Sequence, residues 1–134
     1  MQITRETDYA IRCVLHLSKD PDRVIMVDSI ARDKKIPKSF LAKILQKLSK
    51  AGIVKSFRGV NGGYQLDKHP SEISLLNIIE SIEGPVLMNE CAMNKKACDM
   101  SDTCSVHPVW VKIREIVEGT LSDYNLETLT INKK

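Results

Sequence analysis

The sequence feature that most constrains the fold is an amphipathic helix followed directly by a short, glycine-rich hairpin. The predicted helix covers residues 38–52, and its apolar positions follow i, i+3, i+4, i+7 spacing at Leu41, Ile44, Leu45 and Leu48. Gly52 is suited to a left-handed C-cap. Residues 53–58 alternate as in a strand, residues 59–63 are rich in turn formers, and residues 64–66 can form the returning strand. The pattern predicts a helix joined to a two-stranded wing.

Helical periodicity also extends to both sides of this unit. The further predicted helices cover residues 5–19, 27–35 and 75–82, with a long last helix that opens at His107-Pro108. Thr4 is the predicted cap of the first helix, and Asp28 is the predicted cap of the second. The second helix stops before Pro37, because the residue before a proline is pushed out of the helical region.

Three helices followed by a hairpin are typical of a winged helix-turn-helix domain. The predicted fold class is therefore mainly α with a small β wing, followed by a long C-terminal helix.

Positive charge is concentrated on the predicted third helix and the wing. The chain carries a formal net charge of +3 at pH 7, yet residues 32–58 hold nine Lys and Arg residues against a single acid, Asp33. A charge run is often only a solvated face, and winged helices also serve as protein-interaction modules. Concentration of the surplus on one supersecondary unit favours double-stranded DNA as the partner.

Residue types on the helix and wing indicate how DNA would be contacted. Lysine ammonium groups neutralise phosphates, whereas serine and glutamine side chains can hydrogen-bond to base edges in the major groove. Arg58 is long enough to enter a minor groove. The glycines at 59, 62 and 63 also permit positive φ in a tight turn, whether or not DNA is bound. The predicted DNA-binding set is Lys38, Ser39, Lys43, Gln46, Lys47, Arg58, Gly59 and Asn61.

The sequence predicts a cytoplasmic protein without a membrane partner. No apolar run approaches the roughly 20 residues of a membrane-spanning helix, and the N-terminus lacks the features of a signal peptide. A reducing cytosol disfavours structural disulfides and shifts the four cysteines towards packing, metal binding or redox sensing. Cys13 shares helical spacing with Tyr9 and Leu17, so we predict it in the core.

Three cysteines and a histidine cluster in a segment with little apolar periodicity, at the spacing Cys91-x6-Cys98-x5-Cys104-x2-His107. Structural zinc sites usually take two ligands from a tight C-x2–4-C knuckle, and this segment has none. Three thiolates on a long loop suit a larger object, such as a [2Fe–2S] or [4Fe–4S] cluster. Zinc or bare redox thiols remain the alternatives.

Nearly the whole chain resembles the iron–sulfur-sensing winged-helix regulators typified by IscR and NsrR. The resemblance is carried by Asp8-Tyr9-Ala10, by residues 48–54 (LSKAGIV), by residues 58–64 (RGVNGGY) and by the three cysteines before a last helix. It implies a homodimer whose long C-terminal helices pair, and which binds near-palindromic promoter sites as a repressor.

The resemblance also implies roles for individual residues. DNA-contacting positions of the family fall on Ser39, Phe40, Lys43 and Arg58. Two residues are candidates for the fourth cluster ligand beside Cys91, Cys98 and Cys104. His107 stands where IscR-like members have an in-chain histidine, and Asp8 stands where NsrR-like members supply a carboxylate from the partner subunit. Ala42 replaces an acidic base-reading residue of the IscR-like branch, so the target sequence of that branch does not transfer.

These inferences divide the chain into a DNA-binding domain (residues 1–84), a cluster-binding loop (85–106) and a dimerisation helix with a C-terminal tail (107–134). The expected function is transcriptional regulation controlled by a cluster that senses iron–sulfur status, nitric oxide or redox stress. An electron carrier or scaffold that does not bind DNA is an alternative, but it leaves the basic segment unexplained. An enzyme is not expected, because the chain has no phosphate loop, nucleophile–base motif or paired-carboxylate pattern.

Overall fold

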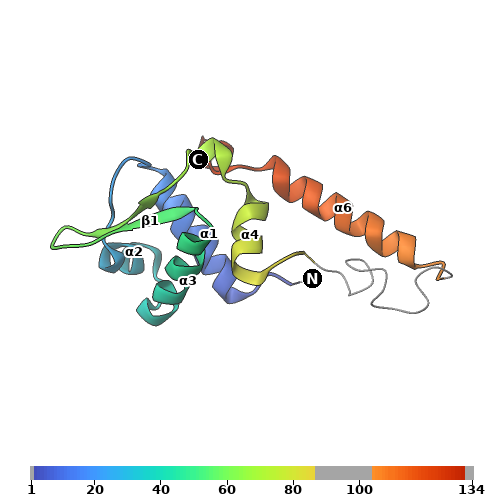
Figure 1. Cartoon of the computed structure of the whole chain (residues 1–134), viewed down its shortest axis with the longest axis horizontal. Helices are drawn as coiled ribbons and strands as arrows, with labels where there is room; N and C mark the ends of the chain where they lie inside the picture. Colours follow the sequence, from blue (N-terminus) through green and yellow to red (C-terminus); the bar gives the residue numbers. More distant parts are fainter. Residues whose placement is uncertain (1, 87–103, 132–134) are drawn as a thin grey trace.

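The structure is a computed structural model that describes residues 2–86 and 104–131. The elements, in chain order, are α1 (Arg5–Ser18), α2 (Val27–Lys34), α3 (Lys38–Lys50), β1 (Val54–Phe57), β2 (Gly63–Leu66), the short 3-10 helix η1 (Pro70–Glu72), α4 (Leu75–Glu83), α6 (His107–Asp123) and α7 (Leu126–Ile131). Figure 1 shows the hairpin and α6 at opposite ends of the molecule, with α1, α3 and α4 between them. The predicted mainly α fold with a small β wing is confirmed.

Helix α1 is the central packing element. Thr4 caps it as predicted, because its Oγ1 accepts a hydrogen bond from the Thr7 backbone N–H at 3.2 Å. The buried face of α1 includes Ala10, Cys13, Val14 and Leu17. Helices α2, α3, α4 and α7 and strand β2 all contact α1, so one apolar face organises the described domain.

Helix α3 ends where the sequence predicts, and the turn that ends it leads directly into the first strand of the wing. All four residues of its apolar stripe are buried. Gly52 adopts φ 75°, and its N–H donates to the Ser49 carbonyl while the Ile53 N–H donates to the Leu48 carbonyl, each at 3.0 Å. These two bonds form a Schellman motif, which turns the chain directly from the helix into β1.

The predicted cap of α2 is wrong by two residues. The cap position is Met26, without a side-chain cap bond, and Asp28 lies inside the first turn of the helix. The Asp28 carboxylate instead forms an ion pair with Lys38 at the start of α3. The helix stops before Pro37 as predicted, through Lys35 in the left-handed conformation at φ 53°.

The wing is a two-stranded antiparallel hairpin in which Val54 pairs with Leu66 and Phe57 with Gly63. Of its three glycines, Gly59 has the positive φ expected of a turn, at 109°. Gly63 is required for a different reason: a Cβ there would lie 2.2 Å from the Ile25 carbonyl oxygen. This close approach belongs to a β-bridge between Ile25 and Tyr64, which fastens the wing to the segment before α2.

The sequence did not predict α7, which occupies part of the expected C-terminal tail. Leu126 is completely buried, and its N–H donates to the Ile73 carbonyl at 2.9 Å. The Ser18 and Thr130 hydroxyls lie 2.9 Å apart and join α7 to the end of α1. The chain therefore runs back toward the domain along α6 and rejoins the core through α7 (Figure 1).

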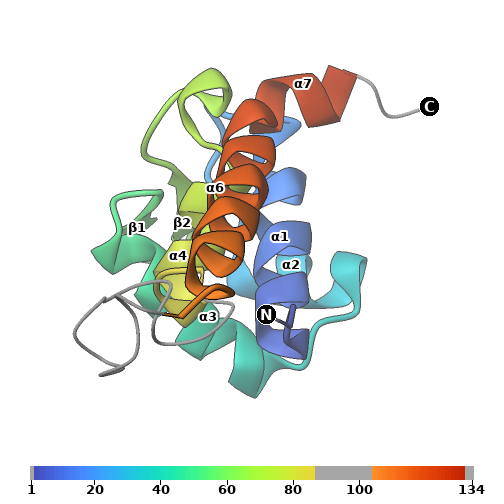
Figure 2. The same ribbon diagram turned by 90° about the vertical axis from the view of Figure 1, so that its right-hand side faces the viewer.

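Helix α6 lies along the outside of this domain. It contacts α4 but has no buried residue, and Figures 1 and 2 both show it on the outer side of α4. Within residues 2–86 and 104–131, no helix combines the length and the apolar character needed to cross a membrane.

The substitution Gly63→Ala should destabilise the protein by about 1–3 kcal/mol, because the added methyl group overpacks the Ile25 carbonyl. Gly119→Ala on α6 is the matched control, since a Cβ there meets no atom within 4 Å. An alanine inside a helix is more favourable than a glycine, so we expect a gain of about 0.5–1 kcal/mol. Urea unfolding measures both changes. Equal stabilities for the two variants would contradict the conclusion that the Ile25 carbonyl requires a glycine at position 63.

Candidate functional site

The solvent-facing side of α3 carries most of the predicted DNA-binding residues. Lys38, Ser39, Phe40, Lys43 and Gln46 are all exposed, while the opposite side of the helix fills the core. The first turn of α3 contains no acidic residue. A face of this kind can approach the phosphates and base edges of a major groove without burying a charge.

A groove of about 690 Å³ joins the start of α3 to the wing. Lys38, Arg58 and Gly59 line it, so the structure brings together predicted DNA-binding residues from α3 and from the wing. Met26 and Phe57 supply apolar surface in the same groove, and both are exposed. The sequence gives no sign of these two residues, because isolated apolar side chains on a surface follow neither helical nor strand periodicity.

Phe40 packs against α1 as well as facing solvent. Its ring meets the edge of Tyr9 with centroids 5.8 Å apart and an interplanar angle of 70°, and 44% of Phe40 stays exposed. The guanidinium carbon of Arg12 lies 5.3 Å from the centroid of the Tyr9 ring. Tyr9 and Arg12 therefore belong to the surroundings of the site, which helical spacing alone did not indicate.

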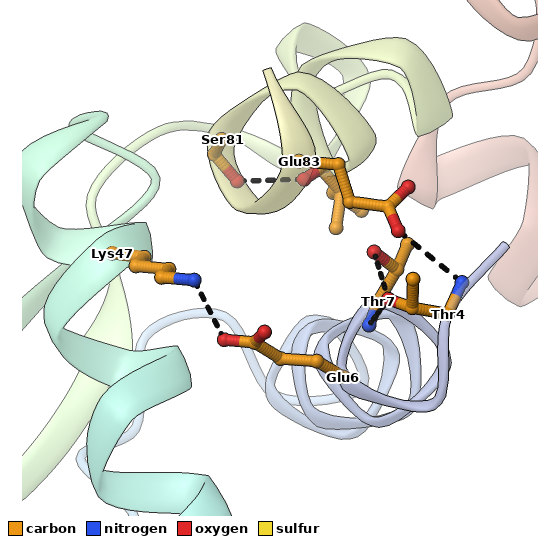
Figure 3. Close-up of polar contacts among 7 residues, drawn as sticks. Thr4, Glu6, Thr7, Lys47, Ser81 and Glu83 are labelled. Atoms are coloured by element: carbon orange, nitrogen blue, oxygen red, sulfur yellow. Dashed lines mark hydrogen bonds and ion pairs between the residues drawn. The ribbon is translucent and has the colours of Figure 1, made fainter. Parts of the chain in front are cut away.

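Lys47 differs from the other predicted lysines. It is half-buried, and its Nζ lies 2.8 Å from Oε1 of Glu6 on α1. Figure 3 shows the two side chains reaching toward each other between the helices. Glu6 was not predicted as part of the site, since 41 residues separate it from Lys47 and no local pattern links them.

Asn61, near the tip of the wing, lies apart from the α3 groove. It lines a second hollow of about 450 Å³ together with His16, Arg23 and Arg32. Burial, followed by the charge of Lys34, lowers the pKa of His16 below its ordinary value. The second hollow therefore mixes charges, because Asp20 and Asp33 also line it and Asp33 pairs with Arg32 at 3.3 Å.

The described part of the cysteine segment begins at Cys104. Its thiol is free and half-buried, three residues before His107. His107 opens α6, and its Nδ1 is buried without a hydrogen-bond partner among the described residues. A buried imidazole nitrogen without a partner costs free energy, so this atom fits a ligand role.

The other predicted ligands do not meet Cys104 within the described structure. Cys91 and Cys98 lie outside the described residues. Asp8 is exposed on α1, where its carboxylate pairs with Arg12 at 2.9 Å. Among residues 2–86 and 104–131, no group of three His, Cys, Asp or Glu side chains is arranged to hold a metal ion.

Cys13 lies away from this segment, in the core. It is completely buried, as its helical spacing predicts. Burial raises the pKa of the Cys13 thiol to about 12. The thiol therefore stays protonated and unreactive at physiological pH.

Comparison with known proteins identifies the kind of chain that carries this arrangement. Residues 3–132 match the Rrf2 family, described as an iron-dependent transcriptional regulator. The chain belongs to the Rrf2 family. It is thus a DNA-binding transcriptional regulator built on a winged helix-turn-helix, as the basic helix and wing indicate.

Relatives of this Rrf2-family chain include two regulators of the helix-turn-helix type. NsrR of Bacillus licheniformis is 30% identical over 135 residues, covering 99% of this chain and 94% of that protein. IscR of Photorhabdus laumondii is 29% identical over 135 residues, covering 100% and 82%. The solved structure of CymR, the global cysteine regulator of B. subtilis, matches with a TM-score of 0.77 and 28% identity, covering 100% of this chain and 99% of that chain.

Removing the Arg58 side chain should weaken promoter binding by about 1–3 kcal/mol if the arginine makes a specific base contact. Fluorescence anisotropy with a labelled promoter duplex measures the change. Lys68→Ala removes one exposed cation between β2 and η1, outside the predicted contact set, and serves as the control. Equal affinities for Arg58→Ala and Lys68→Ala would remove Arg58 from the contact set.

The raised pKa of Cys13 makes a prediction about stability at alkaline pH. The pKa of the Cys13 thiol is higher in the folded protein than the ordinary value of 9.0. The thiol therefore contributes fully to the free energy of unfolding below pH 9, and this contribution is lost as the pH rises toward about 12. Cys13→Ala should cost about 1 kcal/mol at neutral pH. Urea unfolding should show this difference narrowing above pH 9, and a constant difference would be the contrary result.

Proposed function

We propose that this Rrf2-family regulator is a repressor whose promoter affinity is controlled by an iron–sulfur cluster held by residues 91–107. The observation that carries the proposal is the groove between the basic helix α3 and the wing. The same chain has a free thiol at Cys104 and, three residues later, a buried His107 Nδ1 without a hydrogen-bond partner among the described residues.

The proposed DNA contacts follow from exposure and position. Helix α3 enters the major groove, where Ser39 and Gln46 meet base edges and Lys43 meets a phosphate. The groove between α3 and the wing takes the sugar–phosphate backbone beside Lys38, while Arg58 at its wing end reaches into the adjacent minor groove. The remaining proposed contacts, which complete the predicted set apart from Lys47, are Phe40, Gly59 and Asn61.

The proposed ligands of the cluster are the thiolates of Cys91, Cys98 and Cys104, with a fourth ligand from His107 or Asp8. Two described residues fit this role, because within residues 2–86 and 104–131 the Cys104 thiol is free and the His107 Nδ1 has no hydrogen-bond partner. Oδ2 of Asp8 accepts a hydrogen bond from Arg12 at 2.9 Å, so Oδ1 would be the ligand atom of Asp8. When bound, the cluster supplies a centre sensitive to iron supply, nitric oxide or oxidation.

The proposed dimer interface is the outer surface of α6. Val109 is 49% exposed and Ile116 57% exposed on this helix, which has no buried residue in the described chain. A second copy of α6 would cover these side chains. Two copies related by a two-fold axis then present two α3 helices to a near-palindromic site.

A thiol-based regulator is the second candidate function. The Cys104 thiol is free and half-buried, and the similar CymR is described as a global cysteine regulator. In this version the same DNA-binding dimer responds through cysteine oxidation, or through zinc, without an iron–sulfur cluster. The two candidates share every DNA contact and differ only in what the cysteines hold.

Two measurements on one anaerobic preparation test the proposal. Visible absorbance with iron and sulfide analysis should reveal a cluster, and salt-dependent anisotropy should show binding to the chain's own promoter. Colourless protein that binds DNA would favour zinc or thiols. Coloured protein that fails to bind promoter DNA at low salt would instead favour the electron carrier or scaffold.

Substitution of the cysteines and the two candidate fourth ligands locates the site. Cys98→Ala should abolish the visible absorbance and change the promoter affinity. His107→Ala and Asp8→Ala separate the two candidates, because only the true ligand should alter the spectrum. An unchanged spectrum and an unchanged affinity in Cys98→Ala would contradict the proposed control.

A further inference from the structure

We propose that Glu6 is a positioning residue for α3, and that Lys47 acts as an internal clamp to α1 rather than as a phosphate contact. This inference rests on the proposed DNA-binding function of α3. It assigns a role to Glu6, which no sequence pattern selected, and it changes the role expected of Lys47.

The ion pair is the first observation. Glu6 lies in the first turn of α1, and its Oε1 lies 2.8 Å from Nζ of Lys47 on α3. The side chains are 30% and 43% exposed, so the pair is partly shielded from water. Partial burial strengthens the attraction relative to a fully exposed pair.

A second contact makes the geometry specific. Glu6 and Tyr9 are three residues apart on α1, while Phe40 and Lys47 are seven residues apart on α3. Both spacings return to one side of a helix. Tyr9 meets Phe40, and Glu6 meets Lys47. Helix α3 is thus held at two points about 10 Å apart along its axis.

Two such points fix more than the distance between the helices. One contact would let α3 tilt relative to α1, whereas two contacts spaced along its axis oppose that tilt. Tilting would move Ser39 and Gln46 away from the base edges that they are proposed to meet. The clamp therefore acts on affinity through the orientation of α3.

The same turn of α1 is also tied to α4. The Thr4 N–H donates to Oε1 of Glu83, the last residue of α4, at 3.3 Å. Figure 3 shows Thr4 and Glu6 on one turn, with Glu83 on one side and Lys47 on the other. The first turn of α1 thus connects the end of α4 with α3, which gives the Glu6 contact a fixed base.

The two possible roles of Lys47 predict opposite effects of removing Glu6. If Lys47 contacts a phosphate, Glu6 competes with DNA, and Glu6→Gln should tighten binding and steepen its salt dependence. If Glu6 and Lys47 form a clamp, Glu6→Gln should loosen α3 and weaken binding without changing the salt slope.

The experiment measures promoter affinity by anisotropy over a range of salt concentrations. The variants are Glu6→Gln, Lys47→Gln and the double substitution, with Lys43→Gln as the matched control for a phosphate-contacting lysine. For the control, the salt slope should fall by about 1.8, because each of the two protomers loses one phosphate contact. Lys47→Gln and Glu6→Gln should each weaken binding up to about five-fold with the wild-type slope, and the double variant should bind no more weakly than the single variants.

Tighter binding by Glu6→Gln, or a slope in Lys47→Gln that falls as far as in Lys43→Gln, would overturn the clamp. Failure of the wild type to bind promoter DNA at low salt would contradict the proposed function instead. In that case urea unfolding of the wild type, Glu6→Gln, Lys47→Gln and the double variant tests the ion pair. Coupling between the effects of the two substitutions on the free energy of unfolding supports the clamp, and strictly additive effects overturn it.

Discussion

The apolar face of α1 is the contact on which the rest of this structure depends. Its buried residues are Ala10, Cys13, Val14 and Leu17. They form the centre of a core to which α3, α4, α7 and strand β2 of the wing all pack. Because α3 and α4 both pack on this helix, a movement of α1 alters the position of α3. A regulator can use such a shared helix to convert a local change near α4 or α6 into a change in DNA binding.

The fold pairs some of the positively charged residues in the segment 32–58 with carboxylates and leaves others exposed. Lys38 pairs with Asp28, Lys47 with Glu6, and Lys55 approaches Asp67 at 4.0 Å. Internal carboxylates therefore offset part of the local surplus. Lys43 and Arg58, both exposed, remain on the surface proposed to face DNA. A count of lysines along the chain accordingly overestimates the number of phosphate contacts.

Local patterns predicted the elements that depend on local physics. The stripe of α3, its glycine ending and the alternating wing each follow from neighbouring residues, and the structure confirms all three. Long-range contacts were missed, since Leu126 is buried only because the chain returns beside Ile73. The Glu6–Lys47 pair escaped prediction for the same reason. Asp28 was assigned to a cap because its long-range partner Lys38 could not be foreseen.

The most direct test of control by a cluster is the promoter affinity of one anaerobic preparation before and after its cluster is removed. Salt concentration and protein concentration are held constant, so that phosphate contacts and dimer formation do not differ between the two measurements. We predict that Kd changes by about 5- to 150-fold, the usual range of coupling between two sites. Equal affinities for the loaded and the emptied protein would contradict cluster control.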